Sequence, residues 1–426
     1  MVEDSNMYTW EEVEQRVKSG EKWIVVENKI YNVKNWQRKH PGGAKIIAHF
    51  HGQDATEAWR SMHNDLKLIQ KYMNPLLVGR IKNAKTNQLT EDFGQLREKF
   101  KNMELFKVQP IFYLLHFLHI IGIECVAWYL LWQFGDCWPV WLVSAGLLAT
   151  AQAQAGWTQH DYGHLSVFNN FKLNHLFHQI TIGHLKGASS HWWNFRHFQH
   201  HVKPNIHKKD PDITLPQVFL LGDHLPREWG SQKRGKAPYN HQHNYFWILG
   251  PWFLLPGYFH LENIYFVLMR RDWYDVLWMS TFFLKFFYLG NSILAGGWAT
   301  FKFYMFVRWL ESHWFVFVTQ MNHLPMEIGK DHNNDWVTSQ LISTCNVEPG
   351  LFNNWFSGHL NFQIEHHLFP TMPRHNYPKV APYVKDLCKK HNVTYVEKKL
   401  GTAFADIIRS LRKSGKLWFN AYYHID

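Results

Sequence analysis

The chain is poor in cysteine: its 426 residues contain only four, at positions 125, 137, 345 and 388, and none forms a CxxC pair. This scarcity argues against a disulfide scaffold and a thiolate metal site, and it fits a reducing compartment. The segment Met1 to Glu12 has no apolar run and carries four acidic residues. We therefore expect no cleavable secretory signal and a cytosolic N-terminus. No fixed-period repeat or low-complexity tract is evident, which argues against a solenoid.

Acidic residues are also in deficit, because 34 Asp and Glu face 45 Lys and Arg, with 29 His counted as neutral. We interpret the net charge of +11 as a cytosolic face that lies on anionic headgroups or receives a phosphate-bearing substrate, and we expect no nucleic-acid partner. Aromatic residues make up 17% of the chain, yet its mean hydropathy is negative. Apolar stretches must therefore alternate with polar ones, which predicts that part of the chain lies in a bilayer.

Composition divides the chain into three parts. Residues 1–81 contain β-rich runs at Trp23–Val26 and Ile30–Val33, followed by helical patterns, which predicts a small soluble α+β domain. Residues 82–110 are polar and charged, as expected of a linker and an amphipathic approach to a bilayer. Residues 111–426 contain the long apolar runs, the His motifs and a basic tail, which predicts an all-α membrane domain with a cytosolic helical cap.

Five apolar runs are candidates to cross the membrane. Ile111–Phe134 and Trp138–Trp157 are joined by a short turn without basic residues, which predicts a hairpin with a lumenal turn. The remaining runs are Phe246–Met269, Val276–Leu294 and Trp298–Val318. Only two of these three can cross if the His motifs share one side, so we expect about four transmembrane helices. Lys285 makes the middle run our choice for the interfacial one, although Arg270 and Arg271 would then lie in the lumen, against the charge rule.

A first His motif lies in the N-terminal part. His40-Pro-Gly-Gly43 is a rigid turn whose glycines let the backbone pass close to a flat ligand. His63 follows 23 residues later, after a helix-start signal in Gly52–Thr56, so the two imidazoles could lie on opposite faces of a haem. An iron held by two His passes single electrons, because it has no vacant position. The alternative is that both are ordinary surface residues.

These features together resemble cytochrome b5 over residues 1–81. The resemblance implies haem b held by His40 and His63, with electrons supplied from NADH through a cytochrome b5 reductase.

Three further clusters have helical spacing. The first has His at i and i+4, and the other two have polar donors at i, i+3 and i+4, so each set shares one face of a helix. The ligand candidates are His160, His164, His197, His200, His201, His366 and His367. Neutral imidazole suits iron, copper, zinc and nickel, so the spacing predicts a transition metal without naming it. One cluster alone would fit a structural role equally well, but three on one expected side of the membrane favour a metal centre.

The three clusters resemble the histidine boxes of membrane fatty-acid desaturases, which bind two non-haem irons. Gln363 replaces the first His of the third box, and together with the fused haem domain this resembles the front-end desaturases. The segment Trp355–Arg374 makes the similarity closest to the vertebrate Δ5/Δ6 acyl-CoA desaturases. The resemblance carries the catalytic diiron-ligand role to the seven box histidines and proposes His323 and Gln363 as further ligands. The alternatives are a buried structural role for His323 and a water-mediated or orienting role for Gln363.

Removing two hydrogens from an unactivated methylene chain requires a metal that activates O2. We therefore expect a multi-pass enzyme of the endoplasmic reticulum, with both termini cytosolic, that desaturates polyunsaturated fatty acyl-CoA, at Δ6 by preference and Δ5 next. Candidate contacts to the CoA phosphates are Lys203, Lys208, Lys209 and Arg374, and candidate partners of the ligand rings are Asp161, Asp210, Asp212 and Glu365. The rival enzymes are a b5-fused sphingolipid desaturase and a fatty acid hydroxylase. The rival outside enzymes is a membrane electron-transfer or metal-transport protein.

Overall fold

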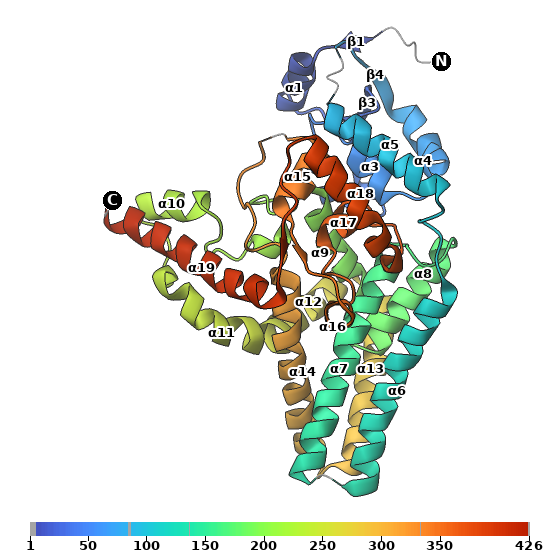
Figure 1. Cartoon of the computed structure of the whole chain (residues 1–426), viewed down its shortest axis with the longest axis vertical. Helices are drawn as coiled ribbons and strands as arrows, with labels where there is room; N and C mark the ends of the chain where they lie inside the picture. The colour runs from blue at the N-terminus through green and yellow to red at the C-terminus, as the bar shows by residue number, and fades with distance from the viewer. Residues whose placement is uncertain (1–5, 84–86, 136, 333, 425–426) are drawn as a thin grey trace.

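The computed structural model describes residues 6–83, 87–135, 137–332 and 334–424. A small sheet-containing domain lies at one end of the molecule, a layer of short helices lies in the middle, and four long helices extend away from that layer (Figure 1).

The N-terminal domain is α+β, as the sequence predicts. Its four strands pair in the order β1-β4-β3-β2, with β1 parallel to β4 and the other pairs antiparallel. The two β-rich runs form β2 and β3, whose Ile24, Val26 and Tyr31 are buried. The strands are β1 (Met7–Tyr8), β2 (Trp23–Val26), β3 (Lys29–Asn32) and β4 (Leu77–Ile81), and the helices are α1 (Trp10–Lys18), η1 (Gln37–Lys39), α2 (Ala44–Ala48), α3 (Thr56–Met62), α4 (Leu66–Met73) and η2 (Asn74–Leu76).

The polar segment after this domain forms one amphipathic helix, α5 (Gln88–Asn102), which Asn87 caps by accepting a hydrogen bond from the Leu89 amide. Its apolar side does not face solvent, because Phe93 and Phe100 are fully buried and their rings each lie 5.2 Å from Phe369. The apolar face expected to approach a bilayer is therefore covered by protein, and α5 joins the small domain to the C-terminal part through a shared core.

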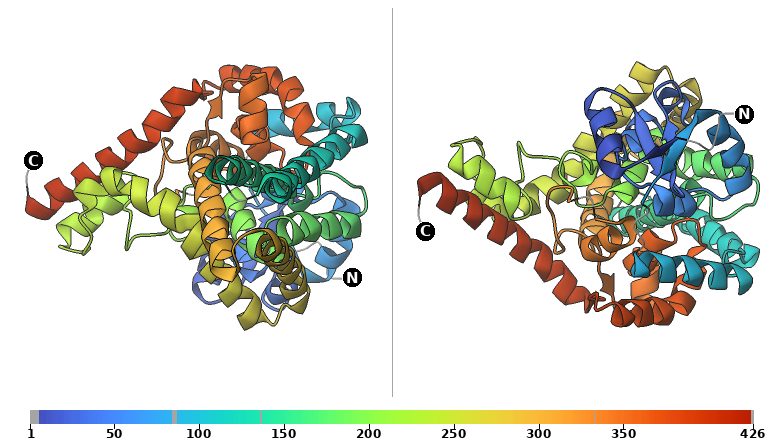
Figure 2. Two further views of the ribbon diagram at one scale, coloured as in Figure 1. Left: turned by 90° about the horizontal axis from the view of Figure 1, so that it is seen from below. Right: turned by 90° about the horizontal axis from the view of Figure 1, so that it is seen from above.

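Four long helices lie side by side: α6 (Pro110–Phe134), α7 (Trp138–Gly163), α13 (Trp273–Ile293) and α14 (Gly297–Gln320) (Figures 1 and 2). In the described part of the chain, α6 alone is long and apolar enough to cross a membrane by length and composition. The other three carry more polar side chains, including Lys285 in α13 and the buried Arg308 and Glu311 in α14.

The run expected to be interfacial differs in shape from the one that the structure breaks. The run with Lys285 forms the continuous helix α13, and Lys285 Nζ lies 2.7 Å from the carboxylate of Glu124 on α6. The Phe246–Met269 run is the broken one, since it divides into α11 (Gln242–Phe253), the π-helical η6 (Leu254–Phe259) and α12 (His260–Arg270). Pro251 and Pro256 lie at this break, and each lacks the amide that an α-helix requires.

The remaining elements form the middle layer and an arm. Helices α9, α15, α17 and α18 lie between the small domain and the long helices, whereas α10, α11 and α19 project to one side (Figure 1). These elements are α8 (Phe171–His178), η3 (Gln179–His184), α9 (Ser190–Val202), η4 (Pro211–Ile213), α10 (His224–Ser231), η5 (Tyr239–His241), α15 (Trp336–Ser343), β5 (Asn346–Val347), α16 (Leu351–Ser357), α17 (Gln363–Leu368), η7 (Arg374–Asn376), α18 (Tyr377–Lys390), β6 (Glu397–Lys398) and α19 (Leu400–Tyr423).

Candidate metal centres and substrate cavity

The imidazoles of His40 and His63 face one another in the small domain. His40 follows η1, His63 ends α3, and their ring centroids lie 6.1 Å apart. His63 Nδ1 donates to the Trp59 carbonyl at 2.8 Å, so its Nε2 remains available to a ligand. Burial lowers the pKa of both rings, to about 4 for His40, which keeps them neutral at physiological pH. Neutral imidazole is the form that binds a metal.

The spacing and the glycine turn fit a haem. Two metal–nitrogen bonds of about 2 Å, together with the ring radii, place two imidazole centroids about 6 Å apart across one iron atom. Gly43 has a φ of +97°, and a Cβ on Gly42 would approach the His40 ring to 3.0 Å, so larger residues would disturb the turn that presents His40.

Five box histidines form a first buried cluster, in which one ring nitrogen of each lies within 4.8 Å of those of the others. Its members are His160, His164, His197, His201 and His366. His160 lies in α7 and His164 directly follows it, His197 and His201 lie in α9, and His366 lies in α17. The cluster therefore joins segments that are separated by up to about half the chain. The Nε2 atoms of His197 and His164 are 2.9 Å apart, those of His201 and His197 3.0 Å, and those of His366 and His201 2.9 Å.

Such spacings fit one metal ion, because neighbouring ligands at about 2.1 Å from an ion lie about 3 Å from each other. A glycine brings α17 to this position. Gly358 has a φ of +59°, and an added Cβ would lie 2.2 Å from the Cβ of Trp157 on α7. No side chain larger than hydrogen allows that approach.

His200, His323 and His367 form the second cluster, whose ring nitrogens also lie within 4.8 Å of one another. The Gln363 amide Nε2 lies 2.8 Å from His323 Nε2, so Gln363 borders this cluster. The His367 Nε2 atom is buried without a hydrogen-bond partner in the described part of the chain, as expected of a ligand atom. The structure thus divides the nine predicted residues into five on one side and four on the other.

Outer hydrogen bonds orient the ligand rings. His200 Nδ1 lies 2.9 Å from Asp210, His367 Nδ1 lies 2.8 Å from Gln340 Oε1, and His366 Nδ1 lies 3.0 Å from the Tyr377 hydroxyl. His323 Nδ1 donates to the Ser343 carbonyl at 3.1 Å. The acceptors Asp210, Gln340 and Ser343 each fix the tautomer that leaves the lone pair on Nε2, and the Tyr377 hydroxyl holds the orientation of the His366 ring, which is the usual support of a metal-binding His. The sequence identified Asp210 but missed the other three partners, because nothing local to the boxes points to them.

The other three acidic candidates serve different partners. Glu365 accepts from Asn346 and Tyr395 at 2.7 Å each, and Asp161 lies 3.2 Å from the Arg374 guanidinium. Asp212 lies 3.9 Å from His200 and 3.3 Å from Arg196, so it acts mainly as a partner of Arg196.

Electrostatics keeps most of the ligands neutral. Burial, reinforced by neighbouring imidazoles, lowers the pKa of His164 and of His323 to about 3 and holds the pKa of His201 and His367 well below the usual value. His200 differs: burial opposes its protonation, but the Asp210 carboxylate outweighs burial and raises its pKa. Because most of these imidazoles stay neutral, their nitrogen lone pairs are available to bind a metal ion.

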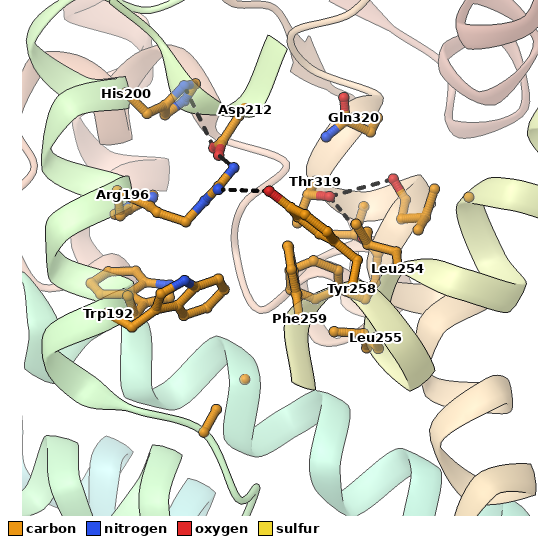
Figure 3. Close-up of a pocket in the computed structure, with 18 of the residues that line it drawn as sticks. Trp192, Arg196, His200, Asp212, Leu254, Leu255, Tyr258, Phe259, Thr319 and Gln320 are labelled. Atoms are coloured by element: carbon orange, nitrogen blue, oxygen red, sulfur yellow. Dashed lines mark hydrogen bonds and ion pairs between the residues drawn. The ribbon is translucent and has the colours of Figure 1, made fainter. Parts of the chain in front are cut away.

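A cavity of about 230 Å³ opens beside both clusters. His160, His197, His200, His323 and Gln363 line one region of it, and most of the remaining wall is apolar. Figure 3 shows Trp192 and Arg196 of α9 facing Leu254, Tyr258 and Phe259 of η6 across the cavity. The break in the apolar run therefore supplies a cavity wall. An elongated apolar ligand would have its reacting carbon beside the metal ligands in such a cavity.

Three of the four residues expected to contact CoA phosphates are engaged within the protein. Arg374 is buried and donates to the Trp157 carbonyl at 3.0 Å, and Lys203 and Lys209 lie 3.1 and 2.6 Å from Asp331. Only Lys208 of the four is exposed. Arg374, Lys203 and Lys209 thus have partners within the protein that the sequence did not reveal, since positive charge alone does not distinguish a ligand contact from an internal ion pair.

A paired-imidazole pocket in one domain, two imidazole clusters in the other and an apolar cavity beside them form an arrangement typical of a metal-dependent oxidoreductase. Comparison with protein families agrees with this class. Residues 136–399 match the fatty acid desaturase family, and residues 9–82 match the cytochrome b5-like heme/steroid binding domain. The chain therefore belongs to the fatty acid desaturase family and carries a fused cytochrome b5-like domain, an arrangement consistent with a front-end desaturase. Membership implies haem, a non-haem diiron centre, and association with a membrane.

Proposed function

We propose that this protein is a front-end desaturase that inserts a cis double bond into polyunsaturated fatty acyl-CoA, at Δ6 by preference and at Δ5 next. The observation that supports this most is the apolar cavity bordered by both His clusters in a chain that also has a paired-His haem pocket. A second support is Gln363 at the position where the third box would otherwise begin with His.

The two clusters would hold one iron each. His160, His164, His197, His201 and His366 would bind the first, and His200, His323 and His367, with Gln363 beside them, the second. Two non-haem irons supply the O2 activation that removal of hydrogen from a methylene chain requires. The protein contributes the position of the acyl chain, because Trp192, Leu255 and Phe259 form a fixed apolar wall that excludes water from the reacting carbons.

His40 and His63 would hold haem b, which supplies electrons one at a time. We propose NADH–cytochrome b5 reductase as the source of these electrons. The domain limits that follow are 1–81 for the haem domain, 82–110 for the linker and 111–426 for the desaturase domain.

We further propose that α6, α7, α13 and α14 cross the endoplasmic reticulum membrane and that both termini are cytosolic. The broken segment from α11 to α12 would then lie at the cytosolic interface. Arg270 supports this, because its guanidinium lies 5.0 Å from the ring of Phe195 on α9 and so on the side of the His clusters. Assigning α13 as a crossing helix thus removes the conflict of Arg270 and Arg271 with the positive-inside rule.

Expression in yeast supplied with one polyunsaturated acid at a time tests the proposal. We expect a new cis double bond on the carboxyl side of an existing one, and its position identifies the regiochemistry. His200→Ala and His366→Ala should abolish the product while haem binding persists. Hydroxylated acids or altered sphingoid bases as the products would replace the proposal with one of the rival oxidations.

A further inference from the structure

The haem domain contacts the desaturase domain through a partly buried polar cluster, which we call the interdomain clasp. It comprises the Gln53 side chain and the His49 carbonyl of the haem domain with Lys203, Lys209 and Asp331 of the desaturase domain. Lys203 Nζ donates to Gln53 Oε1 at 2.7 Å, Lys209 Nζ donates to the His49 carbonyl at 2.9 Å, and Gln53 Nε2 donates to Asp331 at 3.1 Å.

The desaturase domain brings positively charged groups to the clasp, and the haem domain brings the oxygen atoms that accept their hydrogen bonds. On the desaturase side two ammonium groups share one carboxylate, and hydrogen bonds and charge from these lysines hold the pKa of Asp331 far below its usual value despite burial. Among the groups that make up the clasp, one positive charge is in excess. Lys203 is only 4% exposed, and a buried ammonium is costly unless its protons are bonded. The haem domain supplies the neutral acceptors, and the Phe50 ring lies 5.4 Å from Lys203 Nζ.

The clasp is built on the loop that also supports the second His cluster. Lys203 and Lys209 belong to the segment between α9 and η4, and this segment ends at Asp210, the partner of His200 Nδ1. The Asn205 amide donates to the same Asp210 carboxylate at 2.8 Å. The strand-like segment before Asp331 is held to this loop, because the Gly329 amide donates to the Asn205 carbonyl at 3.1 Å.

Both haem-ligand loops face segments that bear ligands of the first cluster. Asn64, which follows His63, donates to the carbonyl of Leu165, which follows His164, at 2.9 Å. On the other side of the pocket, Gly43 of the His40 turn lies against Phe195, two residues before His197. At the first contact the desaturase residue, Leu165, is next to His164 in the sequence. At the second contact the desaturase residue, Phe195, is two positions before His197.

We propose that the interdomain clasp docks the haem domain for electron delivery within the same chain, an inference that rests on the proposed function. With haem held by His40 and His63 and iron held by the two His clusters, each transfer would oxidise the haem by one electron and reduce the non-haem iron by one. Two transfers, two protons and one O2 would balance the conversion of a CH2–CH2 unit to CH=CH with release of two waters. NADH would supply the electron pair through the reductase. The clasp takes no part in the chemistry. It holds the haem domain close to the His clusters, which keeps the distance for electron transfer short.

Substitution of Gln53 tests the clasp in opposite directions in the full-length protein. Gln53→Lys places a third cation beside Lys203 and Lys209 and should undock the domain. Gln53→Glu gives two carboxylates for two ammonium groups and should keep it docked. Lys208→Glu is the matched control, since Lys208 is exposed on the same loop. Hydrogen exchange over 49–53 and 329–331 reports docking without reference to activity.

We expect Gln53→Lys to raise exchange in both segments and to slow substrate-dependent haem reoxidation by about tenfold or more, with an unchanged haem spectrum and unchanged reduction by the reductase. Gln53→Glu and Lys208→Glu should behave as the unsubstituted chain does. Unchanged exchange in Gln53→Lys overturns the clasp, and raised exchange with unchanged reoxidation overturns its role in electron delivery. Failure of the proposed function is distinguishable, because the unsubstituted chain would then form no double bond while hydrogen exchange still decides the docking.

Discussion

The side-chain amide of Gln363 lies 2.8 Å from Nε2 of His323, in the cluster completed by His200 and His367. His323 Nδ1 donates to the Ser343 carbonyl, so His323 Nε2 presents its lone pair to the cluster and to Gln363. The second cluster therefore has three imidazoles and one amide, whereas the first has five imidazoles. An amide is a weaker ligand than imidazole for a transition metal, so the two sites should differ in affinity.

Removing either of these two residues should empty the second site first. We expect His323→Ala to retain about one non-haem iron per chain, and Gln363→Leu to lose part of the second iron on dilution, because a supporting group contributes about 10–100-fold in metal affinity. Iron by mass spectrometry, normalised to haem absorbance, measures this. Gln363→His is the matched control and should retain both irons. Equal loss from both sites in His323→Ala would contradict the division into two clusters.

We expect Asp210 to affect iron binding by orienting the imidazole of His200. Asp210→Asn removes the carboxylate 2.9 Å from His200 Nδ1 and should lower iron affinity or turnover by about 10–100-fold. Asp212→Asn provides the comparison, since Asp212 lies 3.9 Å from the same ring and mainly pairs with Arg196. We expect a smaller loss there. Similar losses in both variants would show that local charge, and not ring orientation, is what His200 requires.

The haem pocket should be separable from the diiron centre. His40→Ala and His63→Ala should each lose the haem absorbance and product formation while non-haem iron stays bound, because the His clusters share no ligand with the pocket. His51→Ala, which lies between the two in sequence, should keep haem. Absorbance spectra and iron content of purified protein provide the measurement. Retention of haem in both ligand variants would refute the assignment.

The pair formed by Glu124 and Lys285 should stabilise the long-helix bundle. Its atoms lie 2.7 Å apart, and the two side chains are only 14% and 23% exposed. Glu124→Leu leaves an ammonium unpaired between helices and should cost about 3 kcal/mol, lowering the melting temperature in detergent. The exchanged variant Glu124→Lys with Lys285→Glu should recover most of this loss. No recovery would indicate that the surroundings, and not the pair, determine stability at this position.

Local spacing made much of the site predictable. The imidazoles at i, i+3 and i+4 share a helix face whatever the rest of the fold does, and the His40 turn is defined by its own glycines, so these residues could be found from the sequence. Tyr377, Gln340 and Ser343 could not, because their partners lie 11 to 27 residues away along a chain whose path no periodicity reveals. The ion pairs of Lys203 and Lys209 with Asp331 were missed for the same reason.

The helix arrangement differs from the expectation for another reason. Lys285 was treated as unfavourable within an apolar helix, but Glu124 on a neighbouring helix neutralises it. The signal that marked the broken run was present in the sequence as Pro251 and Pro256. The physical lesson is that a charge in an apolar run depends on what lies opposite, whereas a missing backbone amide interrupts the helix whatever its neighbours are.

The core that joins the two domains limits how the protein can be re-engineered. Ile46 and Phe50 of the haem domain belong to the same buried cluster as Phe93 of α5 and Phe369 beyond α17. Cutting the chain in the linker and separating the fragments would expose an apolar surface on each, so neither fragment should be stable and soluble by itself. A substitute electron donor would have to reproduce that apolar face, and a bare haem-binding unit on a longer tether would not suffice.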